Sequence, residues 1–315
     1  MATGLTTTDK AKRARELTTK MQDATATPQA RLHACHGLID LYTPELTRSL
    51  PAGVNGSRLV DVARQHLREK PELLECTPDS LMSALSRAML GGMELGGPRP
   101  EAYVVPFNTK CKLPGGKEVW RKIATCIESW RGLVKLIANT GRMTRQPLLM
   151  AVYHGEDFRV EMEDYQTRVR HSPDAQNKSR LTDDDGAIEY VYAVVWIDGQ
   201  TVQHWMPRAE IEAVRIKHSK SQSTWETHWR EMAYKTVIRQ MIARGMVPIS
   251  HDLVEAMRRA QASEAIERAA AEDRTIDAAT WTVLGDDAPA EVAEEKPQQA
   301  QATSQDSDGQ MGDRP

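Results

Sequence analysis

The sequence lacks the features that mark a membrane-spanning chain, a secreted disulfide scaffold or a zinc module. No apolar run approaches the roughly 18 residues that cross a bilayer. The basic N-terminus is not followed by the apolar stretch of a secretory signal. The cysteines stand far apart without a CxxC pair, at Cys35, Cys76, Cys111 and Cys126. We therefore expect a cytoplasmic protein that does not bind membranes.

The motifs of several enzyme classes are also missing. The segment LPGGKE (113–118) has no glycine at the upstream position that a P-loop requires, and Glu118 stands where a P-loop has Ser or Thr. Neither the GxGxxG of dinucleotide-binding folds nor the GxSxG of serine hydrolases occurs. His33, Cys35 and His36 do not aim three ligands at one point of a helix, so we expect no metal site there. These absences favour a binding protein over an enzyme.

Charge is unevenly distributed along the chain. The whole sequence has 41 Lys and Arg against 44 Asp and Glu, a net charge of −3, but residues 261–315 hold 4 of the basic and 13 of the acidic residues. Residues 1–260 therefore carry a net charge of +6. A basic body with an acidic tail is typical of a protein that binds a polyanion. The tail either competes with that polyanion, binds a partner or only aids solubility.

Hydrophobic periodicity predicts an α+β fold, with a mostly antiparallel sheet of hairpins packed against helices. We expect a flexible N-terminal arm (1–27), one domain (28–272) and a disordered acidic tail (273–315). Helices are predicted at 30–42, 60–67, 81–89, 130–140, 208–217, 225–244 and 251–272. Strands are predicted at 103–107, 119–127, 148–153, 158–162, 189–197 and 201–206.

Turn residues between the predicted strands indicate how the strands pair. Strands 148–153 and 158–162 flank a turn and are expected to form one hairpin. Asp198 and Gly199 stand between the last two strands and predict a type I′ turn. The polar stretch 164–187 is too long for a tight turn, so we expect it to be flexible.

The segment WETHWREMAYKTVIRQMIARG (225–245) is the most informative part of the chain. On a helix, Trp225, Trp229 and Met232 fall on one line, and further apolar lines run beside it. Lys235 and Arg239, four residues apart, lie between two apolar lines. Burying such a basic pair is costly unless an anion neutralises it. That anion is either a carboxylate of the same fold or a phosphate of bound nucleic acid.

More cations accompany this segment, both upstream and on the predicted helix 130–140. Surfaces that bind single-stranded nucleic acid combine cations for the phosphates with aromatic rings for unpaired bases. Large aromatic residues are also common in ordinary cores, and single cations are commonly only solvated. The clustering favours DNA binding, with the cations of the 208–244 helices lining one groove. The candidate contacts are Tyr103, Arg131, Lys135, Arg208, Arg215, Lys217, Lys220, Trp225, Lys235 and Arg239.

Several short motifs follow one another in a fixed order over about residues 80–250. They are GMEL (92–95), AY (102–103), PFN (106–108), RGL (131–133), GEDF (155–158), VYAV (191–194), SK (219–220) and WETHWREMAYKTVIR (225–239). With this order and spacing, the chain resembles the RecT family of phage and prophage single-strand annealing recombinases. It departs from the family pattern at 108–118, at 164–187 and at Gln240, where a second basic residue is expected.

The resemblance implies an ATP-independent protein that coats single-stranded DNA and anneals complementary strands, without bond-making chemistry. It also implies an α+β core with a basic groove for DNA, and assembly into rings or helical filaments. Expected partners are single-stranded DNA, the annealed duplex, further copies of the chain, a 5′→3′ exonuclease and the host single-strand-binding protein. The expected location is the bacterial cytoplasm at the nucleoid. No cofactor is expected, apart from Mg²⁺ associated with bound DNA.

Two other classes stay open as alternatives. A metal-dependent DNA nuclease would act on similar DNA. A helix-turn-helix regulator of double-stranded DNA would use the helices 208–217 and 225–244. The seven-residue loop between these helices is unlike the usual tight turn, which weighs against the regulator.

Overall fold

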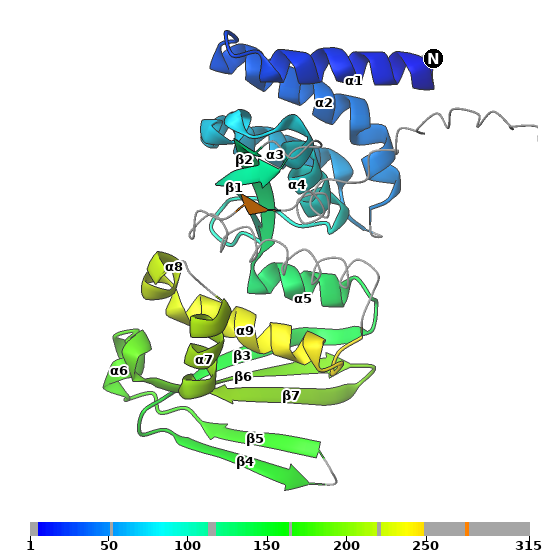
Figure 1. Cartoon of the computed structure of the whole chain (residues 1–315). Helices are drawn as coiled ribbons and strands as arrows, with labels where there is room; N and C mark the ends of the chain where they lie inside the picture. Colours follow the sequence, from blue (N-terminus) through cyan, green and yellow to red (C-terminus); the bar gives the residue numbers. More distant parts are fainter. Residues whose placement is uncertain are drawn as a thin grey trace, which may run out of the picture.

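The computed structural model describes residues 6–50, 53–112, 118–163, 166–218, 222–248 and 275–276. In Figure 1 the N-terminal helices lie at one end of the molecule and an antiparallel sheet lies towards the other, with α5 and α9 between them. The fold is therefore α+β with mostly antiparallel strands, which confirms the predicted class. Buried apolar side chains form two large clusters, one within residues 17–126 and one within 133–247. Among the helices in the described ranges, none is long and apolar enough to cross a membrane.

Helices build the N-terminal part around the first cluster. They are α1 (Thr7–Gln22), α2 (Pro28–Arg48), α3 (Gly56–Glu69), the 3-10 helix η1 (Pro71–Glu75) and α4 (Pro78–Leu90). Thr6 caps α1 by accepting a hydrogen bond from the Asp9 N–H at 3.2 Å. Leu17 and Met21, four residues apart on α1, are buried in the first cluster. The expectation of a flexible arm at 1–27 is therefore wrong for the residues of this helix.

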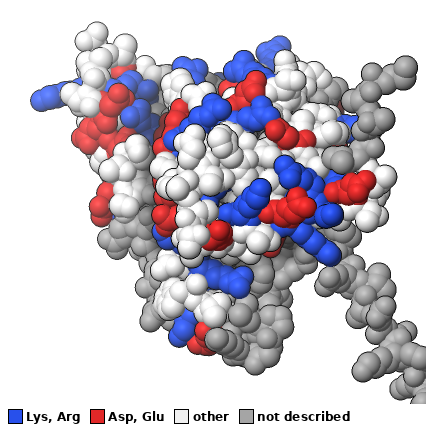
Figure 2. Space-filling view, turned by 90° about the horizontal axis from the view of Figure 1, so that it is seen from above, with Lys and Arg blue, Asp and Glu red and all other residues white. Residues whose placement is uncertain are grey.

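The outer face of these helices carries both signs of charge. Figure 2 shows Lys and Arg side chains interspersed with Asp and Glu across this face. Lys10 of α1 forms an ion pair with Glu45 of α2, and Arg64 of α3 forms one with Asp40 of α2. The basic excess of the chain is therefore not concentrated on this face.

Strands β1 (Ala102–Lys112) and β2 (Glu118–Glu128) form a long antiparallel hairpin in continuous register. This confirms the two strands predicted at 103–107 and 119–127. Strand β8 (Thr275–Ile276) pairs in parallel with the far end of β1. Two residues of the predicted disordered tail are thus paired in a sheet, and the rest of 273–315 lies outside the described residues.

The second part of the chain is built on a three-stranded antiparallel sheet in the order β3-β6-β7. Its strands are β3 (Met143–Tyr153), β6 (Ile188–Ile197) and β7 (Gln200–Pro207). Asp198 and Gly199 join β6 to β7 with φ angles of 49° and 79°, which confirms the type I′ turn. One face of the sheet packs in the second cluster with α5 (Trp130–Ala138), α7 (Arg208–His218), α8 (Gln222–Thr227) and α9 (Trp229–Ala243).

The single helix predicted at 225–244 is two helices, α8 and α9. His228 separates them, because its φ of −138° and ψ of 45° lie outside the helical region. Trp225 and Trp229 are nevertheless both buried, at 3% and 4% exposure, so the break leaves the core packing of both rings intact. The helix predicted at 251–272 lies outside the described residues.

A second hairpin covers the opposite face of the sheet. It consists of β4 (Asp157–Glu163) and β5 (Gln166–Ser172), and Phe158 stacks on Tyr190 of β6 with ring centroids 4.7 Å apart. The predicted pairing of strand 148–153 with 158–162 is wrong, because β3 pairs with β6 instead. The stretch 164–187 is not simply a flexible loop, since its described part forms β5, α6 (Lys178–Leu181) and η2 (Asp185–Ala187).

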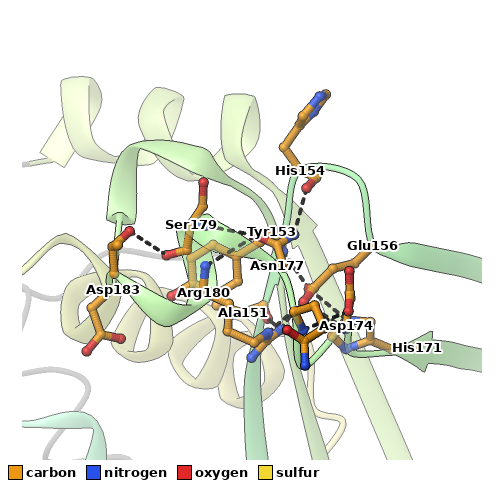
Figure 3. A network of polar contacts seen from close by, with 12 residues as sticks. Ala151, Tyr153, His154, Glu156, His171, Asp174, Asn177, Ser179, Arg180 and Asp183 are labelled. Atoms are coloured by element: carbon orange, nitrogen blue, oxygen red, sulfur yellow. Dashed lines mark hydrogen bonds and ion pairs between the residues drawn. The ribbon is translucent and has the colours of Figure 1, made fainter.

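A buried carboxylate, Glu156, holds the segment after β5 against the sheet, as Figure 3 shows. Arg180 of α6 donates to its two oxygens from Nε at 2.6 Å and from Nη2 at 2.7 Å, and His171 Nε2 lies 3.1 Å from it. Burial raises the pKa of Glu156, but hydrogen bonds from Arg180, the Tyr153 N–H and His171 outweigh this effect and lower the pKa to about 2. Glu156 of the GEDF motif therefore has a structural role, and we call its contacts with Arg180 and His171 the Glu156 clasp.

Candidate nucleic-acid interface

Helix α5 meets α9 through an ion pair between Arg131 and Glu231. Nη1 of Arg131 donates to Oε2 of Glu231 at 2.8 Å, and the indole N–H of Trp130 donates to the same oxygen. The Arg131 guanidinium lies over the Trp130 ring, 4.2 Å from its centroid. The side chains of Arg131 and Glu231 remain 29% and 45% exposed. The predicted DNA contact Arg131 is thus paired within the chain but accessible to solvent.

Lys135 lies one turn further along α5 and is paired in a similar way. Its Nζ lies 2.8 Å from Oε2 of Glu101, which also accepts the Glu94 N–H at 2.9 Å. The Lys135 side chain is 30% exposed. Because Arg131 and Lys135 are four residues apart, they lie on one side of the helix. Two predicted phosphate contacts are therefore neighbours.

The local sequence fixes where α5 sits. Ser129 caps the helix by accepting hydrogen bonds from the N–H groups of Arg131 and Gly132, at 3.1 and 3.3 Å. A Cβ atom on Gly132 would lie 2.2 Å from the carbonyl oxygen of Glu101. Only glycine therefore allows α5 to approach the segment that carries the partner of Lys135. This close approach gives the glycine of the RGL motif a physical reason.

The two basic residues predicted within segment 225–245, Lys235 and Arg239, lie on α9. Lys235 and Arg239 follow Glu231 at steps of four residues, so they lie on the same side of α9 as the contact with Arg131. Both side chains are half-buried. The basic pair of the sequence pattern thus continues along α9 from the contact with Arg131, on the side of Glu231 that faces away from Tyr234.

Tyr103 of β1 lies beside the same contact and is 41% exposed. Partial burial and the Glu231 carboxylate raise the pKa of Tyr103, while Arg131 opposes this shift. The structure therefore gathers half of the predicted contacts at the junction of α5 and α9. The set that we call the α5–α9 basic strip consists of Tyr103, Arg131, Lys135, Lys235 and Arg239.

Arg208 and Arg215 lie apart from the strip, around Glu212 of α7. Nη1 of Arg215 lies 3.3 Å from Oε2 of Glu212, while Nη1 of Arg208 donates to the carbonyl oxygens of Asp185 and Ile188 at 2.7 and 3.2 Å. The expectation that all cations of the 208–244 helices line one groove does not hold for this pair, because both guanidinium groups lie around Glu212 and against the buried rings of Trp229 and Trp225.

The remaining predicted contacts have separate outcomes. Trp225 is 3% exposed and belongs to the second cluster, so its ring offers no free face to a base. Trp225 is therefore a core residue, as large aromatic residues at helical spacing commonly are. Lys217 is exposed near the end of α7, and Lys220 lies outside the described residues.

The sequence analysis did not identify a group of aromatic and basic residues at the end of the β1–β2 hairpin where β1 ends and β2 begins. Trp120 is 50% exposed, lies opposite Lys110 in the register of the two strands and shares its face of the hairpin with Lys122. Lys110 is paired with Glu118 at 3.1 Å. The signal was present in KEVWRK (117–122), because alternation in a strand brings Trp120 and Lys122 to one face.

Comparison with known proteins places this α+β chain in a family. The RecT family matches residues 57–276, and the chain belongs to it. Protein RecT of Escherichia coli (strain K12) is 29% identical over 215 residues, which cover 68% of this chain and 74% of that protein. No solved structure matches the chain. The family confirms the resemblance read from the motifs and supports a protein of DNA recombination and strand annealing.

Proposed function

We propose that the protein binds single-stranded DNA without ATP and anneals complementary strands through the α5–α9 basic strip. The observation that carries this proposal is that Arg131 and Lys135 of α5 lie on one side of that helix, with Arg131 beside the exposed ring of Tyr103 and paired to α9, the helix that also carries Lys235 and Arg239. Phosphate contacts of this kind give an affinity that does not depend on base sequence and decreases steeply with salt. Tyr103 would support unpaired bases by stacking, and Trp120, on the other face of the β1–β2 hairpin, is a separate candidate for stacking.

Annealing follows from this type of contact without any bond chemistry. Cations on the phosphates reduce the repulsion between two polyanions and leave the base edges free to test complementarity. Once pairing begins, each base step adds stacking of about 1.4 kcal/mol. Self-association into a ring or filament would place the strips of many copies along one strand, so that pairing extends from one protomer to the next.

The proposal includes the partners that the motifs imply. These are single-stranded DNA and the annealed duplex, further copies of the chain, a 5′→3′ exonuclease and a host single-strand-binding protein. The chemistry requires no cofactor, and Mg²⁺ would accompany the bound DNA as its counterion. In the part of the chain that the structure describes, no group of three His, Cys, Asp or Glu side chains could hold a metal ion.

The test mixes the protein with two labelled complementary oligonucleotides and Mg²⁺, in the absence of ATP. We expect duplex to form faster than without protein, with both strands at full length. Shortened strands would instead identify a nuclease. Binding to preformed duplex alone, without faster annealing, would identify a regulator of double-stranded DNA. Native gels report annealing and denaturing gels report strand length in the same samples.

A further inference from the structure

We propose that Glu231 and Glu101 are internal phosphate substitutes, which occupy the anion positions of Arg131 and Lys135 until single-stranded DNA displaces them. This inference rests on the proposed function and adds a regulatory element to it. In the free protein each cation is held by a carboxylate from another segment of the chain. A DNA phosphate must therefore exchange with that carboxylate instead of binding a vacant cation.

The Glu231 site has the donors that a phosphate oxygen would use. Its carboxylate receives hydrogen bonds from the Trp130 indole N–H and from both terminal nitrogens of Arg131, at 2.8 Å for Nη1 and 3.5 Å for Nη2. The Trp130 ring lies against the guanidinium, with its centroid 4.2 Å from the Arg131 Cζ atom. These donors form a fixed set, and a phosphate oxygen can replace the carboxylate oxygen without rearrangement of the donors.

The exposure of the carboxylate distinguishes the Glu231 site from a similar cluster around Glu212. Glu212 also accepts an indole N–H, from Trp229 at 2.6 Å, and Arg208 lies 4.2 Å from the centroid of that ring. However, the Glu212 side chain is 29% exposed, Trp229 is only 4% exposed and Arg208 is bonded to backbone carbonyl groups. The Glu231 side chain is 45% exposed and lies beside the exposed Tyr103. A polymer can reach Glu231, whereas the Glu212 cluster is part of the scaffold.

A displaced carboxylate still lowers the affinity for DNA. Glu231 and Glu101 each belong to a helix or segment that also carries other contacts, so after displacement they remain within a few ångströms of the phosphates. Like charges that remain close together in a partly solvated site repel each other. The two carboxylates thus keep binding moderate and reversible, which allows strands to be released after pairing.

The test replaces Glu231 with Gln, which keeps an oxygen acceptor for Trp130 and Arg131 but removes the negative charge. Affinity for a labelled oligo(dT) is measured over a series of salt concentrations, with thermal unfolding as the check on folding. Glu161→Gln is the matched control, because Glu161 pairs with Arg170 at 2.7 Å on the β4–β5 hairpin, away from α5 (Figure 1). We expect Glu231→Gln to bind about tenfold more tightly at low salt. Its salt slope should be steeper by about 0.7, and Glu161→Gln should change little.

The second part of the test asks whether the gain in DNA affinity of Glu231→Gln depends on Arg131. In an Arg131→Gln background, Glu231→Gln should lose most of its gain, because no cation is left to be released. A folded Glu231→Gln protein that binds no more tightly than Glu161→Gln, or a gain that persists without Arg131, would overturn the inference. If Glu231→Gln does not fold, Glu101→Gln tests the same claim at Lys135. A wild-type protein that does not bind oligo(dT) would overturn the proposed function itself, which is a different outcome.

Discussion

Arg87 of α4 and Glu128 of β2 form a buried ion pair, although they lie 41 residues apart in the sequence. Nε and Nη2 of Arg87 both donate to Oε1 of Glu128, at 2.9 and 2.6 Å, and the side chains are 7% and 3% exposed. Glu128 directly precedes Ser129, the cap of α5. The pair therefore connects the N-terminal cluster to the beginning of the helix that carries Arg131 and Lys135.

We expect Arg87→Met to decrease the free energy of unfolding by about 3 to 5 kcal/mol, because it leaves the Glu128 charge buried without its partner. Chemical denaturation measures this change. The control is the double variant Arg87→Met with Glu128→Leu, which should recover most of the lost stability since neither charge remains. A single variant as stable as the wild type would show that the pair does not matter for the fold.

The Glu156 clasp predicts an acid-dependent contribution to stability. The folded-state pKa of about 2 is below the unfolded value of 4.5, so the contribution is complete above about pH 5 and is lost as the pH falls towards 2. The shift corresponds to about 3 kcal/mol. Denaturation of the wild type and of Glu156→Gln should give a stability difference that shrinks over this range. A difference that stays constant from pH 6 to pH 2.5 would contradict this assignment.

Gly132→Ala should destabilise the protein strongly, because the new Cβ would lie 2.2 Å from the Glu101 carbonyl oxygen and 3.0 Å from the Met93 sulfur. We expect a loss of at least about 2 kcal/mol, as for other overpacked sites. Gly37→Ala on α2 is the control, since its Cβ would meet only the flexible tip of Leu17 at 3.1 Å. Thermal unfolding of both variants checks the prediction, and equal melting temperatures would refute it.

Trp120→Ala should weaken binding to single-stranded DNA while leaving the melting temperature unchanged. One lost stacking contact is worth about 1 to 3 kcal/mol, and the ring is already half-exposed in the fold. Met162→Ala is the control, because Met162 is 78% exposed on the other hairpin. If both variants bind oligo(dT) as tightly as the wild type, Trp120 is not a DNA contact.

Local patterns predicted local structure well. The type I′ turn at Asp198–Gly199 and the start of the helix at Trp130 depend on residues that are neighbours in sequence, so their signals were sufficient. The partners of the strands could not be predicted from the same local patterns. Strand β3 was assigned to the next strand along the chain, whereas it pairs with β6 across the β4–β5 hairpin and α6. Nothing in the local alternation of β3 specifies a partner that far away.

The candidate site shows the same limit. The periodicity of 225–245 identified Lys235 and Arg239, but not that Glu231, which precedes them, pairs with Arg131, 100 residues upstream in the sequence. The pattern also could not decide between core and surface for Trp225, which is buried. Which cations are neutralised within the chain depends on tertiary contacts, and only the structure separates the α5–α9 basic strip from the Glu212 cluster.

The most direct test of the central claim is the affinity of Lys235→Ala with Arg239→Ala for oligo(dT) over a salt series. The account predicts weaker binding and a salt slope that is shallower by about 1.4, as expected for two lost phosphate contacts, with the fold retained. The control removes Arg159 and Arg170, a cross-strand pair on the β4–β5 hairpin, and should change the slope little. Unchanged DNA binding with only a lower melting temperature would contradict the account, because the pair would then be internal scaffolding.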